Sequence, residues 1–130
     1  MPRSLMLAFT SPTSAETEDA YNHWYDTKHL HDVVGIEGVV AATRYKLAHT
    51  IETLPGVGGP TQQYLAVYEL EAETEAELDA FCGNLRAALA GGQADIAPTL
   101  DMADLGASLA LPIGERLLSP NALAGAEIEP

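Results

Sequence analysis

Aromatic and histidine side chains, which can stack on ligands and move protons near neutral pH, are concentrated in residues 21–34. Three of the four His residues of the 130-residue chain and its single Trp lie in this segment. At about 100° per residue, four of its side chains fall on one stripe of a helix, namely Tyr21, Tyr25, His29 and Asp32. An ordinary surface helix carries a single apolar stripe. Rings and imidazoles on several sides are typical of a helix that walls a pocket.

His29 is the strongest candidate for a catalytic group. A neutral imidazole can accept or donate a proton near pH 7, and Asp26 or Asp32, each one helical turn away, could orient the ring. Tyr21 and Tyr25 could offer hydroxyls to a substrate carbonyl or phenol. The alternative is a purely structural His29 that hydrogen-bonds a backbone carbonyl at the end of the helix.

Residues on two predicted strands could extend this site. Arg44 follows small apolar neighbours on its strand face, so it either pairs with a carboxylate inside the protein or binds a substrate anion. Tyr64 and Tyr68 share one face of their strand and would be packed with one polar end. Whether that face meets the helices or a second subunit decides whether the two tyrosines line a pocket.

Other chemistries find little support. The chain has no nucleophile elbow, P-loop or dinucleotide fingerprint, and Cys82 stands in a predicted helix without a neighbouring His. His and Asp alternate every three residues from His23 to Asp32, but steps of three drift around a helix. At most two of them could share an ion, too few for a closed metal site. Acid–base chemistry without a cofactor or metal is therefore expected.

The composition indicates one acidic domain. Hydrophobic residues make up 47% of the chain, enough for a core, and six Lys and Arg against 19 Asp and Glu give a net charge of −13. This charge disfavours nucleic acid and anionic membranes as partners. A single Cys allows no intrachain disulfide, and the short apolar start is unlike a signal sequence, so we expect a cytoplasmic protein.

Apolar periodicity and turn residues predict the element order β-α-β-β-α-β. The first helix is expected to begin at a capping box, Thr13 with Glu16, and to run to Val34 with Gly35 as its left-handed stop. Thr74 with Glu77 repeats the capping box for a second helix. Strands are expected over 4–10, 39–47, 63–71 and 105–111, with a mobile Gly- and Pro-rich loop over 49–61 and a short extension over 115–118.

This order is the split βαβ, ferredoxin-like arrangement: an α+β fold with a four-stranded antiparallel sheet and two helices on one face. The other face of such a sheet is bare, and a second copy of the chain could bury it. Residues 1–118 are expected to form this single domain. The tail, residues 119–130, is either disordered or reaches across a dimer.

The run Trp24-Tyr25-Asp26-x-x-His29-Leu30-x-Asp32-Val33, with the later Gly38-Val39 and Thr43-Arg44-Tyr45, resembles the EthD-like branch of the dimeric α+β barrel superfamily. The likeness covers residues 5–118, and 112–116 look like that branch's last strand. It implies a homodimer whose two sheets form a central barrel, with a ligand cleft between helices and sheet in each subunit. Where the branch usually has Pro-Gly after the first helix, this chain has Glu37-Gly38, which puts a carboxylate near the pocket rim.

The resemblance and the residues together suggest a small cofactor-independent enzyme of aromatic or polyketide metabolism, an isomerase, cyclase or lyase. His29 would act as general base or acid with Tyr25 and Asp32. An apolar carbonyl or phenolic substrate would be bound by Tyr21, Trp24, Arg44, Tyr64 and Tyr68. The alternatives are a cofactor-free monooxygenase and a non-catalytic protein that binds a hydrophobic ligand or haem, because the fold alone does not settle the reaction.

Overall fold

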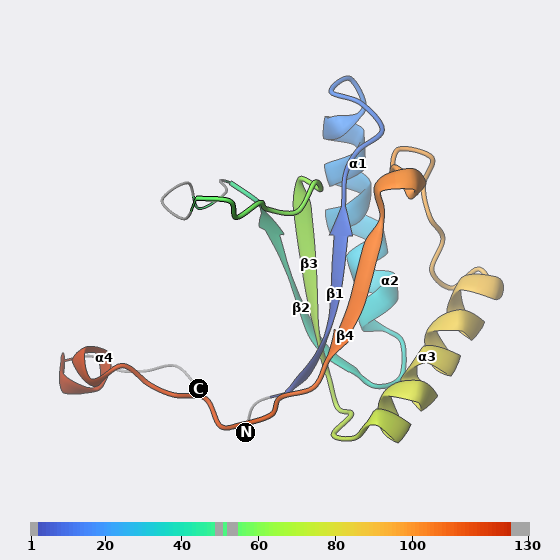
Figure 1. Ribbon diagram of the computed structural model, residues 1–130. Coiled ribbons are helices and arrows are strands. Elements are labelled where there is room, and N and C mark those ends of the chain that lie inside the picture. Colours follow the sequence, from blue (N-terminus) through green and yellow to red (C-terminus); the bar gives the residue numbers. More distant parts are fainter. Residues whose placement is uncertain (1–2, 49–50, 52–54, 126–130) are drawn as a thin grey trace.

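Four strands form one antiparallel sheet in the order β2-β3-β1-β4 (Figure 1). The computed structural model describes residues 3–48, 51 and 55–125. The strands are β1 (Ser4–Thr10), β2 (Val39–Lys46), β3 (Tyr64–Leu70) and β4 (Gly106–Ala110). The predicted α+β class and antiparallel sheet are confirmed, and the strand order is compatible with a ferredoxin-like fold.

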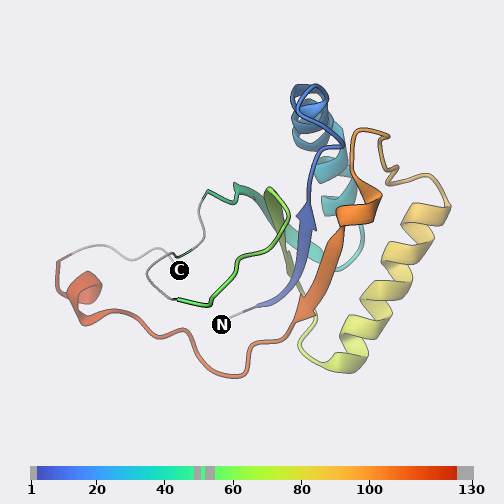
Figure 2. The same ribbon diagram turned by 45° about the horizontal axis from the view of Figure 1, so that its top comes forward.

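The helices follow the predicted order. The first is continuous through α1 (Glu18–Trp24), the π-helical turn η1 (Tyr25–His29) and α2 (Leu30–Val34), and the second is α3 (Glu75–Ala90). A short 3-10 helix η2 (Met102–Asp104) precedes β4, and α4 (Pro120–Gly125) forms within the predicted tail. The long helices lie on the same side of the sheet (Figures 1 and 2). No helix in the described part of the chain is long and apolar enough to cross a membrane.

One of the two predicted capping boxes is confirmed. The Thr74 hydroxyl accepts a hydrogen bond from the Glu77 backbone N–H at 3.1 Å, and α3 begins there. The expected box of Thr13 with Glu16 is wrong, because the first helix begins only at Glu18. Pro12 forms a β-bridge with Leu100, and the Thr13 N–H donates to the Thr99 carbonyl. These distant contacts hold the chain extended where a helix would have started.

The left-handed glycine after the first helix is also not the expected one. Gly35 has φ −73°, in the ordinary helical region, and the chain continues through two further turns. Gly38 takes φ +102° instead, and a Cβ there would lie 3.3 Å from the Phe81 ring. Gly38 therefore makes the turn into β2, at a backbone conformation and a spacing that favour glycine.

The core lies between the sheet and the helices. Tyr64, Ala66, Tyr68 and Leu70 are all buried on one face of β3, as their alternation predicts. That face meets the helices, since these residues share one cluster with Tyr21 of the first helix and Phe81 of α3. Tyr64 and Tyr68 thus belong to the interior of the subunit.

A bulge in β2 interrupts the regular alternation of side chains along that strand. The register shifts between Val39 and Ala41, so Val39 and Ala42 both pack on the core while Val40 is 40% exposed. Strict alternation places Val39 opposite Ala42, but an extra residue in one strand breaks the two-residue period. Beyond the bulge, Arg44 pairs with Ala66 in the register and shares its helix-covered face.

The opposite face of the sheet carries no helix in the described chain (Figure 2). Its side chains include half-buried Leu5, Leu7, Phe9, Leu65 and Val67. The expected strand extension over 115–118 is wrong, because residues 111–119 have irregular backbone that runs away from the sheet to α4. Parts of the predicted 49–61 loop, and the tail after residue 125, lie outside the described residues.

Candidate functional site

A π-helical turn places the site residues of the first helix. Tyr21, Tyr25, His29 and Val33 are buried, each four residues after the last. In a regular α-helix such steps drift by about 40° each, but η1 takes one residue more per hydrogen-bonded turn and removes part of the drift. The stripe therefore continues to Val33 rather than to Asp32. Turns of this kind are frequent at functional sites.

The His29 ring is enclosed and held by two kinds of contact. Its Nδ1 lies 3.2 Å from the backbone oxygen of Asp95, in the loop after α3. The ring stacks on Trp24 with centroids 4.6 Å apart and meets Tyr25 edge-on at 5.0 Å. A carbonyl can only accept a hydrogen bond, so Nδ1 carries the proton and Nε2 keeps its lone pair.

Burial lowers the pKa of His29 below its ordinary value, although the hydrogen bond to the Asp95 carbonyl acts in the opposite direction. The imidazole is therefore neutral at pH 7, which is the form that can take up a proton. The structure is compatible with both the structural and the catalytic role considered for His29, because the ring bonds a backbone carbonyl and also lines a cavity.

Neither of the aspartates expected to orient His29 does so. Asp32 accepts from Lys28 at 2.7 Å, and Asp26 accepts from Arg44 at 2.7 Å. The π-helical turn moves Asp32 off the buried stripe, which removes it from the catalytic role that its spacing suggests. The residue that replaces it, Asp95, acts through its carbonyl oxygen. Because every residue has that group, no sequence signal could have identified this partner.

A cavity of about 120 Å³ lies between the sheet, the first helix, α3 and the loop that follows it. Three predicted site residues reach it: Tyr25, His29 and Tyr68. The rest of the lining is apolar apart from Thr10, comprising Met6, Ala8, Val33, Leu85, Leu89, Ile96, Leu100, Leu105 and Ala107. A benzene-sized ring is known to occupy a protein cavity of about 150 Å³. The space thus suits a ligand of about one ring.

The Tyr68 hydroxyl has an unusual environment within this lining. The side chain is 1% exposed, and its hydroxyl makes no hydrogen bond of good geometry with the described residues, although the neighbouring Tyr25 interacts with it and adds to the rise of its pKa. Burial raises the pKa of Tyr68 well above its ordinary value, so the hydroxyl stays protonated. A buried hydroxyl without a good hydrogen bond is costly, and such groups call for an explanation. A ligand oxygen in the cavity would satisfy it.

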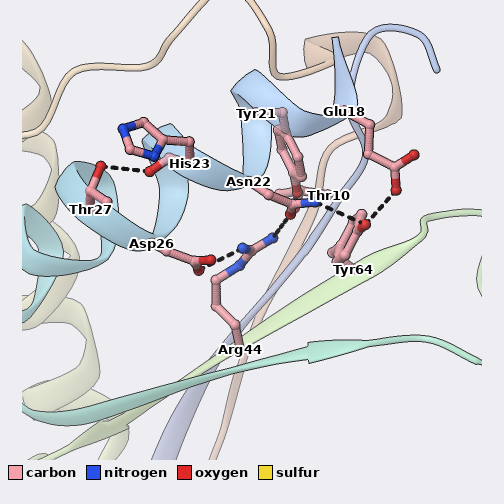
Figure 3. A network of polar contacts seen from close by, with 9 residues as sticks. All are labelled: Thr10, Glu18, Tyr21, Asn22, His23, Asp26, Thr27, Arg44 and Tyr64. Carbon is pink, nitrogen blue, oxygen red and sulfur yellow. Dashed lines mark hydrogen bonds and ion pairs between the residues drawn. The ribbon is translucent and has the colours of Figure 1, made fainter. Parts of the chain in front are cut away.

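Arg44 is the centre of a neighbouring polar network (Figure 3). Its Nη1 donates to Asp26 at 2.7 Å and its Nη2 to Asn22 at 3.0 Å. The guanidinium carbon lies 4.2 Å from the centroid of the Tyr25 ring, a cation–π contact. Arg44 therefore pairs with a carboxylate within the protein, and it supports the Tyr25 ring from outside the cavity.

The other predicted substrate-binding residues are occupied by protein partners. The Tyr21 hydroxyl bonds Thr10, and the Tyr64 hydroxyl donates to Glu18 and accepts from Asn22 (Figure 3). Burial raises the pKa of both tyrosines. Trp24 stacks behind His29 without lining the cavity. These residues shape the wall, while Tyr25, His29 and Tyr68 are those that a ligand could touch.

Comparison of the chain with protein-family models, with curated proteins and with solved structures finds no match. The resemblance to the EthD-like branch therefore stays a prediction. Within the described residues, no three His, Cys, Asp or Glu side chains are grouped so that they could hold a metal ion.

Proposed function

We propose that this protein is a cofactor-independent acid–base enzyme that acts on a small, apolar carbonyl or phenolic compound of aromatic or polyketide metabolism. One observation carries the proposal: a neutral His29, with its Nδ1 bonded to the Asp95 carbonyl, lines the same apolar cavity as Tyr68, whose buried hydroxyl makes no hydrogen bond of good geometry with the described residues. A base and a hydrogen-bond donor in one water-poor space are the two groups that enolisation requires.

The proposed step is transfer of a proton from carbon. His29 Nε2 takes the proton from the carbon next to a carbonyl, the electron pair of that C–H bond forms a carbon–carbon double bond, and the π pair of the carbonyl moves onto its oxygen. The Tyr68 hydroxyl donates a hydrogen bond to this oxygen as its negative charge develops. Return of the proton to another carbon gives an isomer, while attack of the enolate on a second carbonyl of the same molecule closes a ring. Neither outcome needs an oxidant.

Exchange of substrate hydrogen with solvent tests this step before the substrate is known. Cyclohexanone, a single-ring ketone, should incorporate deuterium from D2O faster in the presence of the protein, as followed by NMR. His29→Gln should lower this catalysed rate about 10²- to 10⁴-fold. His31→Gln, on an exposed face of the same helix, is the matched control and should leave it unchanged. Equal rates for the wild type and His29→Gln would overturn the assignment of His29.

The second candidate is a non-catalytic protein that binds a small ligand. The stacking of Trp24 on His29 supports binding and catalysis equally, because the stacked rings form a rigid wall in either case. In the non-catalytic case phenol should bind and change the Trp24 fluorescence, with no deuterium exchange in any ketone. The single-ring size of the cavity argues for such a small ligand over a haem.

We also propose that the protein works as a homodimer in the cytoplasm. The half-buried apolar side chains of the bare sheet face, with Phe9 and Leu65 among them, are the surface that a second copy would cover. Sedimentation equilibrium tests the dimer, and a monomer at micromolar concentration would refute it. The cytoplasmic location rests on the single free Cys82.

A further inference from the structure

The segment between β4 and α4, residues 111–119, is named here the C-terminal arm. It leaves the sheet and runs out on the side away from α1 and α3 (Figures 1 and 2). Two large apolar side chains on it are almost fully accessible, with relative exposures of 104% for Ile113 and 95% for Leu117. Large apolar side chains in water are unfavourable, so their exposure on an extended segment indicates a surface that normally covers them.

A groove on the bare face of the sheet offers such a surface. Its volume is about 710 Å³, and it lies where β2 and β3 lead into the loop between them. Tyr45, Leu65 and Val67 form its sheet side, and Ile51 and Val57 belong to its loop side. Tyr45, Ile51 and Val57 are each at least half exposed, so the groove is itself an apolar surface without a cover.

We propose that the C-terminal arm of one copy lies in this groove of a second copy. In an extended arm, Ile113, Glu115 and Leu117 share one face, with about 13 Å between the first and the last. Ile113 and Leu117 complement the apolar sheet side of the groove, formed by Tyr45, Leu65 and Val67. Lys46 also borders the groove, but it pairs with core-facing Tyr64 and its side chain lies on the helix-covered face, so the fit rests on the apolar side chains.

The positions of arm and groove favour exchange between copies over folding back. The arm begins after Ala110, which pairs with Leu5 on the β4 edge of the sheet. The groove lies on the β2 edge, at Leu65, which pairs with Phe9. Arm and groove are thus at opposite edges and opposite ends of the sheet. Two copies related by a two-fold axis can exchange arms reciprocally, which closes the assembly at a dimer.

The inference rests on the proposed dimer, and complementation between two variants tests it. The arm variant carries Ile113→Asp and Leu117→Asp, and the groove variant carries Tyr45→Asp and Val57→Asp. All four side chains are at least half exposed, so the subunit core is left intact. Met102→Asp, at a similarly exposed apolar residue in η2, is the matched control. Removal of residues 112–130 provides a second arm variant that adds no charge.

Sedimentation equilibrium should show a wild-type dimer and an unchanged Met102→Asp dimer. The arm and groove variants should each dissociate at least about tenfold more readily, because apolar contacts are lost on both sides of the two-fold axis. An equimolar mixture of the two should regain dimer, because the intact arm of one fits the intact groove of the other.

Contrary outcomes separate the two proposals. A wild-type monomer would refute both the dimer and the exchanged arm. A wild-type dimer that arm substitution and truncation leave unchanged would refute the exchange alone. Variants that weaken the dimer but do not complement each other would also overturn it, because that result indicates an arm seated on its own subunit.

Discussion

Tyr68→Phe should make the free protein more stable and the enzyme weaker. The substitution removes one oxygen from a side chain that is 1% exposed, and that oxygen makes no hydrogen bond of good geometry with the described residues. A buried polar group left without a hydrogen bond costs about 1–3 kcal/mol. Its removal should raise the free energy of unfolding by about 1–2 kcal/mol, or the melting temperature by about 3–5 °C per kcal/mol in a domain of this size.

Tyr21→Phe is the matched control, since Tyr21 is equally buried but its hydroxyl bonds Thr10. It should lose about 1–3 kcal/mol, because the Thr10 hydroxyl would be left without its partner. Urea and thermal unfolding of the ligand-free protein measure both changes. In the deuterium-exchange assay, Tyr68→Phe should lower the rate about 10- to 100-fold, which is the effect of one hydrogen bond to a charged oxygen. Loss of stability in Tyr68→Phe comparable to that in Tyr21→Phe would show that the hydroxyl has a partner in the protein, and the reasoning would fail.

Further predictions concern the rest of the site. Because burial lowers the pKa of His29 in the folded state, the unfolded chain binds more protons at low pH, and the stability that the neutral ring contributes is lost as pH falls below about 6.5. Urea unfolding at pH 7.5 and 5.5 should therefore show a larger loss in wild type than in His29→Gln, and equal losses would count against a buried neutral ring. Arg44→Ala should lower the free energy of unfolding by about 2–4 kcal/mol, because packing is lost and the Asn22 side-chain oxygen loses its donor. Asp26→Asn should lower it by less than about 1 kcal/mol, because the carboxylate that it replaces is exposed. Deletion of Thr27 should turn η1 into α-helix and restore an ordinary helical stripe. The free energy of unfolding, followed by circular dichroism, should change by less than about 1 kcal/mol, while the rate of deuterium exchange measured by NMR should fall. An unchanged exchange rate would remove any role for the π-helical turn.

Local patterns were sufficient wherever a single period governs the chain. Ser4–Thr10 forms a strand with the predicted bounds, and Tyr64 and Tyr68 share a buried face, because alternation in a strand follows from backbone geometry alone. The Thr74 capping box is equally local, since its hydrogen bonds join residues three apart. The helical period also predicts Tyr21, Tyr25 and His29 on one stripe, and the structure buries all three.

The same patterns fail where one added residue or one distant contact intervenes. The π-helical turn exchanges Asp32 for Val33 on the buried stripe, and the bulge in β2 brings Val39 to the face of Ala42. Each shifts the period by one residue, and no propensity of the residues involved reveals it.

The order of the elements, the acidic charge and the position of His29 as the candidate catalytic group all follow from residue types and their spacing. The surroundings of His29 depend on the folded chain: the Asp95 carbonyl on Nδ1, and the apolar cavity that His29 lines together with Tyr68, whose hydroxyl is buried. The physical reason is that a backbone carbonyl looks the same in every sequence, and the burial of a hydroxyl is a property of packing. Residue types indicate which chemistry is available, but the tautomer of His29 and its enclosure depend on contacts between segments far apart in the chain.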